Sequence, residues 1–122
     1  MTRDRVVAFR DPHGLRPLVI GRLADRYCVA SESCALDIIG ADFVREIEPG
    51  EMVVITEDGI TSSRPFAPTP SRFCIFEYVY FARPDSSANG KNVYAVRKHI
   101  GAELARENPV AADIVVPVPD SL

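Results

Sequence analysis

The stretch Met52-Val-Val-Ile-Thr-Glu-Asp-Gly-Ile-Thr-Ser62 predicts a β-hairpin near the middle of the 122-residue chain. Its first five residues are mostly β-branched and apolar, which favours a strand. Asp58-Gly59 is the strongest short hairpin signal, because glycine tolerates the positive φ that a tight hairpin turn requires. Ile60 to Ser62 supplies the returning strand. We therefore expect paired antiparallel strands in the first half of the chain.

Short strands separated by turn signals also precede this hairpin. We expect them at Arg5 to Arg10, Pro17 to Leu23, Tyr27 to Ala30 and Phe43 to Ile47. The runs Asp11-Pro-His-Gly14 and Glu48-Pro-Gly-Glu51 predict turns, because proline presets φ and glycine tolerates positive φ. Between the strands, Ser31 to Gly40 predicts a short helix with serine at its start and glycine at its end.

Three prolines interrupt the chain after the hairpin. Pro65, Pro68 and Pro70 lie within Arg64 to Arg72, and three prolines so close together cannot share a regular element. We therefore expect an extended connector at residues 65–72. It would separate one domain, residues 1–64, from the beginning of a second domain, residues 73–122.

The aromatic run that follows the connector leaves two interpretations open. The β-branched and aromatic content of Phe73 to Phe81 favours a strand, whereas the spacing of Phe73, Phe76 and Tyr80 fits one face of a helix. Further along, Asn92 is a predicted cap for a helix that ends near Asn108-Pro109. The apolar residues expected on one face of that helix are Val93, Val96, Ile100 and Leu104.

The last apolar run, Ala112 to Val118, predicts a parallel strand buried on both faces. A helix followed by such a strand is half of a βαβ unit, so we expect the natural domain to continue beyond Leu122. The expected fold class runs from α+β in the first domain to α/β in the second.

Composition is typical of a globular protein and argues against several classes. Hydrophobic residues make up 47% and charged residues 25%, with a net charge of −3. This charge gives no electrostatic reason to expect nucleic acid or an anionic membrane as a partner. The apolar runs are too short to span a bilayer, and the charged first residues do not form a signal peptide. Three cysteines without a CxxC pair favour a reducing cytoplasm over a disulfide framework.

Two segments could carry chemistry, and each has a structural alternative. Asp11 to Pro17 contains His13 and Arg16, but it also fits a plain turn in which Arg16 pairs with a carboxylate. Pro119-Asp-Ser121 follows a predicted strand, where α/β sheets bind ligands, yet Asp120 or Ser121 could equally cap a following helix. Phosphate-binding and hydrolase signatures such as GxGxxG, GxSxG and HExxH do not occur.

Five segments, in this order, closely resemble the middle of the amidophosphoribosyltransferase family, and the resemblance covers essentially all 122 residues. They are Val7 to Leu18, Ala30 to Asp37, Glu48 to Glu51, Cys74 to Ser86 and Asp113 to Ser121. The run Cys74-Ile-Phe-Glu-Tyr-Val-Tyr-Phe-Ala-Arg-Pro-Asp-Ser86 is highly specific. The Glu48 to Glu51 turn is weak evidence for the resemblance by itself and supports it only together with the other four segments in this order.

The resemblance implies the closing strands of an N-terminal-nucleophile glutaminase sandwich in residues 1–64. It implies the start of a type I phosphoribosyltransferase domain in residues 73–122. Such enzymes move ammonia from glutamine to phosphoribosyl pyrophosphate, which carries magnesium, and form 5-phosphoribosylamine for purine synthesis. We expect the full-length protein to be a cytoplasmic homo-oligomer.

The resemblance also implies that the catalytic residues lie elsewhere, so we expect an internal fragment that is itself inactive. Some family members hold a four-iron, four-sulfur cluster, and Cys74 matches the position of its first ligand. In cluster-free members that cysteine packs in the core, so both roles stay open for Cys74. A non-catalytic binding or scaffold remnant of the same family and a small iron–sulfur or redox protein are the competing interpretations of the whole chain.

Overall fold

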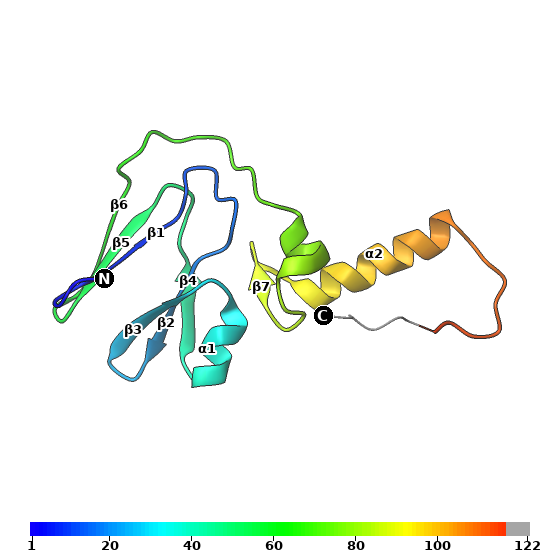
Figure 1. Ribbon diagram of the computed structural model, residues 1–122, viewed down its shortest axis with the longest axis horizontal. Helices are drawn as coiled ribbons and strands as arrows, with labels where there is room; N and C mark the ends of the chain where they lie inside the picture. The colour runs from blue at the N-terminus through cyan, green and yellow to red at the C-terminus, as the bar shows by residue number, and fades with distance from the viewer. Residues whose placement is uncertain (117–122) are drawn as a thin grey trace.

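The computed structural model of the protein describes residues 1–116 (Figure 1). The first sheet has the strand order β1-β5-β6, with β1 at Val6–Phe9, β5 at Met52–Thr56 and β6 at Gly59–Ser63. All its pairings are antiparallel, and Thr56 lies opposite Gly59 across the turn. The predicted antiparallel hairpin is therefore confirmed, but its two-residue turn is Glu57-Asp58, and Gly59, with a φ of 135°, is the first residue of β6.

The second sheet has the strand order β3-β2-β4 and is also antiparallel. Its strands are β2 at Val19–Leu23, β3 at Arg26–Ala30 and β4 at Asp42–Glu46. The helix α1, Ser33–Ile39, lies between β3 and β4 in the chain and ends at Gly40, whose φ of 68° is left-handed as expected for a helix-terminating glycine. Its N-cap is Glu32, without a side-chain capping bond, so the expected serine cap is wrong.

These elements form three layers: the first sheet, the second sheet and α1. One core cluster lies between the two sheets and contains Ala8, Ile20, Ile47, Val53 and Ile55. A smaller cluster between the second sheet and α1 contains Val19, Leu36 and Ala41. Val19 and Ile20 serve different clusters because successive side chains of a strand point to opposite faces.

The C-terminal part, residues 77–107, begins with η1, a single wide turn at Glu77–Phe81 in which the Ala82 amide donates to the Glu77 carbonyl at 3.0 Å. This bond spans five residues and defines a π-helical turn. Neither a strand nor a helix with a buried Phe73–Phe76–Tyr80 face forms, since Phe76 and Tyr80 are exposed. A short ribbon of β7, Ser87–Ala88, and β8, Lys91–Asn92, leads into α2, Val93–Glu107.

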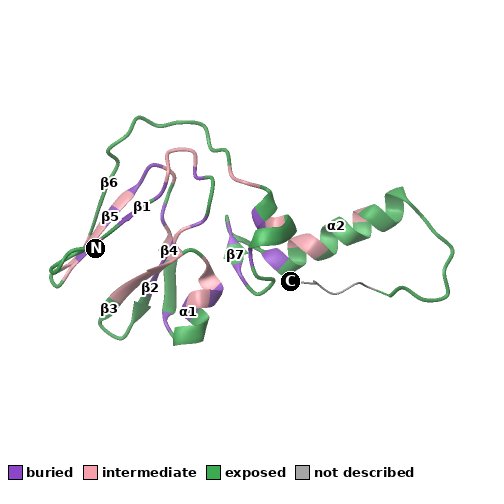
Figure 2. Ribbon diagram, in the orientation of Figure 1, coloured by how far each residue is buried: buried purple, intermediate pink, exposed green. Residues whose placement is uncertain are grey.

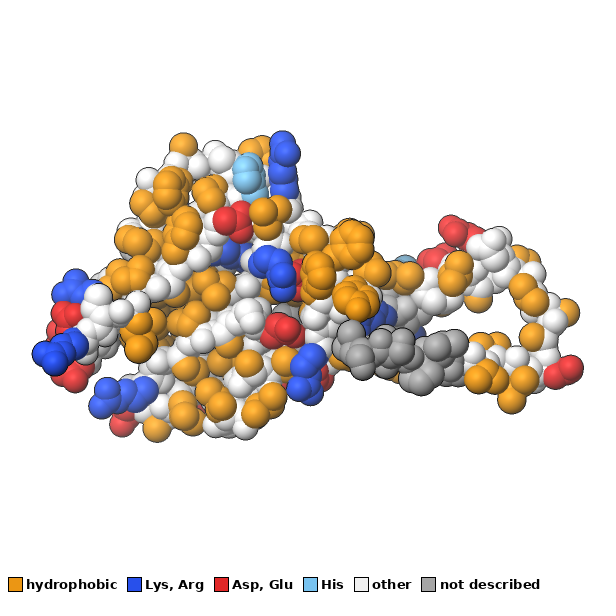
Figure 3. Space-filling model, in the orientation of Figure 1, with side chains coloured by type: hydrophobic (Ala, Val, Ile, Leu, Met, Phe, Trp, Pro, Cys, Tyr) orange, Lys and Arg blue, Asp and Glu red, His pale blue; other side chains and the backbone are white. Residues whose placement is uncertain are grey.

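Helix α2 begins as the sequence predicts and projects away from the sheets (Figure 1). The Asn92 side chain accepts a hydrogen bond from the Ala95 amide at 3.0 Å and caps the helix. Of its predicted apolar face, Val93 is buried whereas Ile100 and Leu104 are exposed. Figure 2 shows that most of α2 beyond its beginning is exposed. Figure 3 shows further hydrophobic side chains on the surface around η1. This part of the chain therefore packs little against the other described residues.

The predicted strand at Ala112 to Val118 is wrong over its described portion. Residues 112–116 form no strand, and Ile114, Val115 and Val116 are at least 75% exposed. A strand requires a neighbour for its backbone hydrogen bonds, and the described residues place none beside it. The remaining predicted positions, including Asp120 and Ser121, lie outside the described residues.

Residues 1–116 thus form a small mixed α and β structure with antiparallel sheets. Their assignment to a glutaminase sandwich and a transferase domain stays a prediction. None of the helices in this range has the length and apolarity needed to cross a bilayer.

Candidate functional site at the junction of the two parts

The family-like turn at Asp11 to Pro17 is built around the buried guanidinium of Arg10. This group donates to the carbonyl oxygens of Arg16 at 2.9 Å and Ile47 at 2.7 Å. The carboxylate of Asp11 accepts from the amides of His13 and Leu15, each at 2.9 Å. The turn is therefore held by hydrogen bonds from the side chains of Arg10 and Asp11 to its backbone, and these bonds do not use the Arg16 side chain.

The Glu48 to Glu51 turn packs directly on this first turn. The Gly50 amide donates to the carbonyls of Arg10 at 3.2 Å and Asp11 at 3.0 Å. A Cβ added at Gly14, whose φ is +61°, would lie 2.6 Å from Cγ of Pro49. Glycine is thus required at position 14 both for its left-handed backbone and for the close approach of the second turn.

The buried carboxylate of Glu51 fixes the second turn from inside. It accepts bonds from the Arg45 guanidinium at 2.6 and 2.9 Å, from the Glu48 amide at 2.7 Å and from the Ser62 hydroxyl at 2.6 Å. The bonds from Arg45 hold the pKa of Glu51 below its ordinary value, against the opposing effect of burial. Glu51 is therefore a structural charge rather than a free acid.

The connector lies along the outer edge of the first turn. The Thr69 hydroxyl donates to the Pro12 carbonyl at 2.6 Å, and the Arg72 amide donates to the His13 carbonyl at 2.8 Å. The Cys74 amide continues the series with a bond to the Leu15 carbonyl at 3.0 Å. His13 is thus a contact point for the connector, and its Nδ1 lies 3.3 Å from the Pro70 carbonyl.

Arg16 reaches from the turn to the C-terminal part, where it forms an ion pair with Glu77. Glu77 is 0% exposed, and apart from Arg16 its carboxylate oxygens have no hydrogen-bond partner among the described residues. Burial raises the pKa of Glu77, with Arg16 opposing and Glu32 adding to the rise. The guanidinium carbon of Arg16 also lies 4.9 Å from the centre of the Phe81 ring. The expectation that Arg16 pairs with a carboxylate is confirmed.

A second contact joins the start of α1 to the loop after η1; we call it the α1 contact. The Glu32 carboxylate accepts from the Arg83 amide and the Ser86 hydroxyl, both at 2.9 Å. Ser33 accepts from the Ser87 amide at 2.8 Å. Ser33, the first residue of α1, thus accepts a hydrogen bond from the C-terminal part.

The η1 turn is held against α2 by Arg97 and against β7 by Tyr78. Arg97 donates to the carbonyls of Tyr78 at 2.6 Å and Ala82 at 2.8 Å, which satisfies carbonyls that the wide turn leaves free. The Tyr78 hydroxyl donates to the Ala88 carbonyl at 2.7 Å. The family-like run from Cys74 to Ser86 therefore forms one compact unit with the start of α2.

Cys74, the predicted metal ligand, is half-buried where the connector meets η1. Its carbonyl accepts from the Glu77 amide at 3.1 Å. Cys28 and Cys34 belong to the layer around α1, and no three His, Cys, Asp or Glu side chains within residues 1–116 come together as a metal-binding group. An iron–sulfur cluster normally takes four thiolates, so the described residues do not fit one by themselves.

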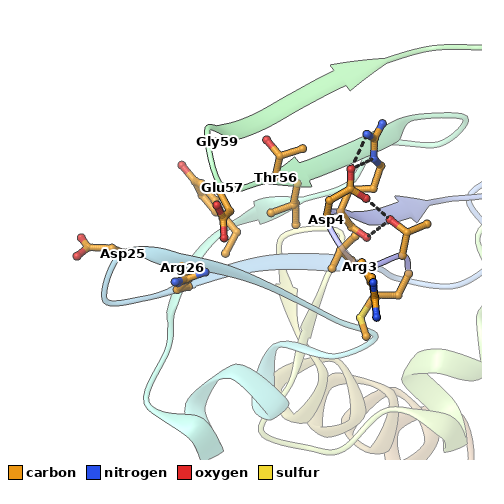
Figure 4. Close-up of a pocket in the computed structure, with 13 residues that line it drawn as sticks. Arg3, Asp4, Asp25, Arg26, Thr56, Glu57 and Gly59 are labelled. Atoms are coloured by element: carbon orange, nitrogen blue, oxygen red, sulfur yellow. Dashed lines mark hydrogen bonds and ion pairs between the residues drawn. The ribbon is translucent and has the colours of Figure 1, made fainter.

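An open cleft of about 650 Å³ lies at the far end of the two sheets, between the N-terminal residues, the β2–β3 turn and the β5–β6 turn (Figure 4). Its charged residues carry both signs. Asp4, for example, accepts bonds from Arg5 at 2.7 Å and from the Thr2 hydroxyl at 2.7 Å. The guanidinium of Arg5 lowers the pKa of Asp4, as expected for an exposed ion pair. The cleft thus holds paired surface charges and no convergent set of reactive groups.

Sequence reasoning missed Glu32 and Glu77, the two carboxylates at the junction. The sequence did contain a signal for Glu77, because it is the single acid in the aromatic run Phe73 to Phe81. If such a run is buried, its acid must be buried with a partner. Glu32 had no such signal, since its partners lie more than fifty positions away in a loop. The arrangement holds two parts of one chain in a fixed orientation through hydrogen bonds and one ion pair.

The comparisons with known proteins point to the same family as the sequence motifs. No family model matches the chain. The amidophosphoribosyltransferase of Rhizobium etli is 55% identical over 98% of this chain, and that of Mycobacterium tuberculosis is 55% identical over 99%. This chain covers 25% and 23% of those two proteins.

Solved structures agree with this relationship. Glutamine phosphoribosylpyrophosphate amidotransferase from B. subtilis, complexed with ADP and GMP, superposes with a TM-score of 0.95 at 49% identity. A structure described as the allosteric regulatory enzyme of purine biosynthesis superposes with a TM-score of 0.93 at 50% identity. Each match covers 99% of this chain and about a quarter of the solved one, 27% and 26% respectively. Over the segment that it spans, the chain belongs to the amidophosphoribosyltransferase family.

Proposed function

We propose that the chain is the joining segment of an amidophosphoribosyltransferase. In that enzyme, water releases ammonia from the amide of glutamine and leaves glutamate. Ammonia then attacks C1 of phosphoribosyl pyrophosphate, so that a C–N bond forms while the C–O bond to pyrophosphate breaks. The product, 5-phosphoribosylamine, begins de novo purine nucleotide synthesis. The observation that carries this proposal is an identity of 55% over 98% of the chain.

The residues of this chain would supply structure to the enzyme rather than reacting groups. A glutaminase nucleophile of this type needs a free α-amino group on the nucleophilic residue itself. Cys28, Cys34 and Cys74 are all internal, so none can take that role. We propose that residues 1–64 complete the glutaminase domain, residues 65–72 connect, and residues 73–122 begin the transferase domain. The enzyme would act in the cytoplasm as a homo-oligomer.

The cofactors of such an enzyme would be held mainly outside the described residues. Magnesium would accompany phosphoribosyl pyrophosphate as its counterion. Cys74 would supply one thiolate to an iron–sulfur cluster of the full-length protein, with three ligands from elsewhere. The position of Cys74 at the end of the connector supports this proposal, because a ligand there would attach the cluster to the junction.

The test compares the full-length protein with the isolated 122-residue chain. The full-length protein should convert glutamine and phosphoribosyl pyrophosphate, with magnesium, to glutamate and phosphoribosylamine. The isolated chain should form neither product above a preparation from cells that carry an empty vector. A full-length protein without either activity, or turnover by the chain that survives removal of contaminating enzymes, would contradict the proposal.

A further inference from the structure

Two separate contacts join the N-terminal part, residues 1–63, to the C-terminal part. One is the Arg16–Glu77 ion pair beside the connector, and the other is the α1 contact. A single point of attachment would let one part pivot about it. Two contacts that start from different elements, the first turn and α1, define an orientation instead.

Glu32 is the centre of the α1 contact. Its Oε2 atom accepts bonds from both the Arg83 amide and the Ser86 hydroxyl, and hydrogen bonds to a carboxylate are among the stronger ones in proteins. Ser86 is 1% exposed, so without Glu32 its hydroxyl would be buried with one partner fewer. The Glu32 carboxylate therefore makes specific hydrogen bonds to this loop and does not simply face solvent.

The loop that Glu32 holds is itself attached to α2. The Val93 amide donates to the Ser86 carbonyl and the Tyr94 amide to the Pro84 carbonyl, each at 3.0 Å. On the other side, Glu32 is the N-cap residue of α1, which packs on the second sheet through Leu36. Hydrogen bonds and packing thus connect the second sheet, α1, Glu32, the loop at 83–87 and the start of α2 without a gap.

We infer that Glu32 is a positioning residue that keeps the two halves of the enzyme oriented for the passage of ammonia between them. The inference rests on the proposed function, in which the first half releases ammonia and the second consumes it. Loss of Glu32 would leave each half able to carry out its own chemistry. Ammonia released from glutamine would then escape to solvent more often before it reaches phosphoribosyl pyrophosphate.

The experiment measures three rates in the full-length protein: glutamate release, phosphoribosylamine formation from glutamine, and phosphoribosylamine formation from an added ammonium salt. For Glu32→Ala, the ratio of phosphoribosylamine to glutamate should fall at least about threefold, while the ammonium-supported rate stays within about twofold of the wild type. Glu32→Gln should restore most of the ratio, since its amide oxygen still accepts hydrogen bonds. Ser86→Ala, which keeps Glu32, should lower the ratio less.

Asp37→Ala is the matched control, because Asp37 is an exposed acid on the same helix. It should leave all three rates unchanged. A wild-type ratio in Glu32→Ala, or an equal loss of the glutamine- and ammonium-supported rates, would overturn the positioning role.

Failure of the proposed function is distinguishable from failure of this inference. If the wild type makes no phosphoribosylamine from glutamine or from ammonium, the proposed function is wrong and the positioning role falls with it. Amide hydrogen exchange in the same protein reports on the contact itself. Exchange at Arg83 should quicken in Glu32→Ala, and unchanged exchange there would overturn the contact whatever the enzyme catalyses.

Discussion

The guanidinium of Arg16 is paired with the fully buried carboxylate of Glu77, and this pair connects the first turn of the chain to η1. A buried charge with one partner is costly to leave alone, because its desolvation is no longer offset. Arg16 itself has a 61% exposed side chain, so solvent weakens the pair relative to a fully buried one. The two residues are therefore unequal, and their substitutions should have different effects.

Arg16→Met should lower the free energy of unfolding by roughly 1–3 kcal/mol at neutral pH, since it leaves Glu77 buried without its cation. Glu77→Gln should be neutral or slightly stabilising, because burial already disfavours the ionised form of Glu77. The double variant Arg16→Met with Glu77→Gln should recover most of the loss. Chemical denaturation of the 122-residue chain measures all three, and additive effects of the two single changes would contradict the coupling.

The acid sensitivity of the fold should depend on Glu51. Its pKa is lowered in the folded state by Arg45, so its contribution is complete above the ordinary value near 4.5 and is lost as pH falls through the lowered pKa. Glu51→Gln should therefore lower stability at pH 7 by about 1–3 kcal/mol and flatten the fall in stability below pH 4.5. The measurement is thermal unfolding at a series of pH values from about 2 to about 7.

Glu57→Gln is the matched control for this series, because it removes an exposed carboxylate near the β5–β6 turn. It should follow the wild-type pH profile. If Glu51→Gln and Glu57→Gln gave the same profile, the assignment of acid sensitivity to Glu51 would be wrong.

Gly14→Ala should destabilise the chain more than Gly40→Ala. Both glycines have a left-handed backbone, with φ of +61° and +68°, so both substitutions carry the conformational cost of about 1 kcal/mol. At Gly14 the new methyl group would in addition press on Pro49, whereas at Gly40 it would meet no atom within 4 Å. Equal melting temperatures for the two variants would show that the two turns do not pack as described.

Limited proteolysis should cut first in the connector. Residues 64–71 are exposed and form no regular element, and such segments fit a protease cleft most readily. Chymotrypsin should cleave after Phe66 before it cleaves after Phe43, although their exposures are similar at 52% and 54%. Phe43 lies in β4, where pairing holds its backbone. A first cut inside Tyr27 to Ile55 with the connector intact would count against the predicted domain boundary.

Cys74 stays a prediction as a cluster ligand and can be tested by metal content. The full-length protein prepared without oxygen should contain iron and acid-labile sulfide, and Cys74→Ala should lose both because iron–sulfur clusters require their thiolates. Cys28→Ala is the control and should keep them. Absence of iron and sulfide from the wild type would make Cys74 a packing residue of the connector.

The sequence by itself determined the local structure of the first half. The hairpin at Met52 to Ser62, the turns at Asp11 and Glu48, and the glycine end of α1 depend on backbone sterics within a few residues. The same holds for the Asn92 cap of α2. The resemblance to the family also lies in the sequence alone, in short runs that follow one another in order along the chain.

Only the tertiary structure decided how these pieces meet. That Gly50 bonds to the Arg10 turn, that Arg16 pairs with Glu77 and that Glu32 reaches Ser86 depends on how the sheets and α1 pack. The run Ala112 to Val116 shows the same limit, because its composition favours a strand that forms only beside a partner. Short-range preferences fix the conformation of a segment, whereas its partners are fixed by burial and hydrogen bonding between segments far apart in the chain.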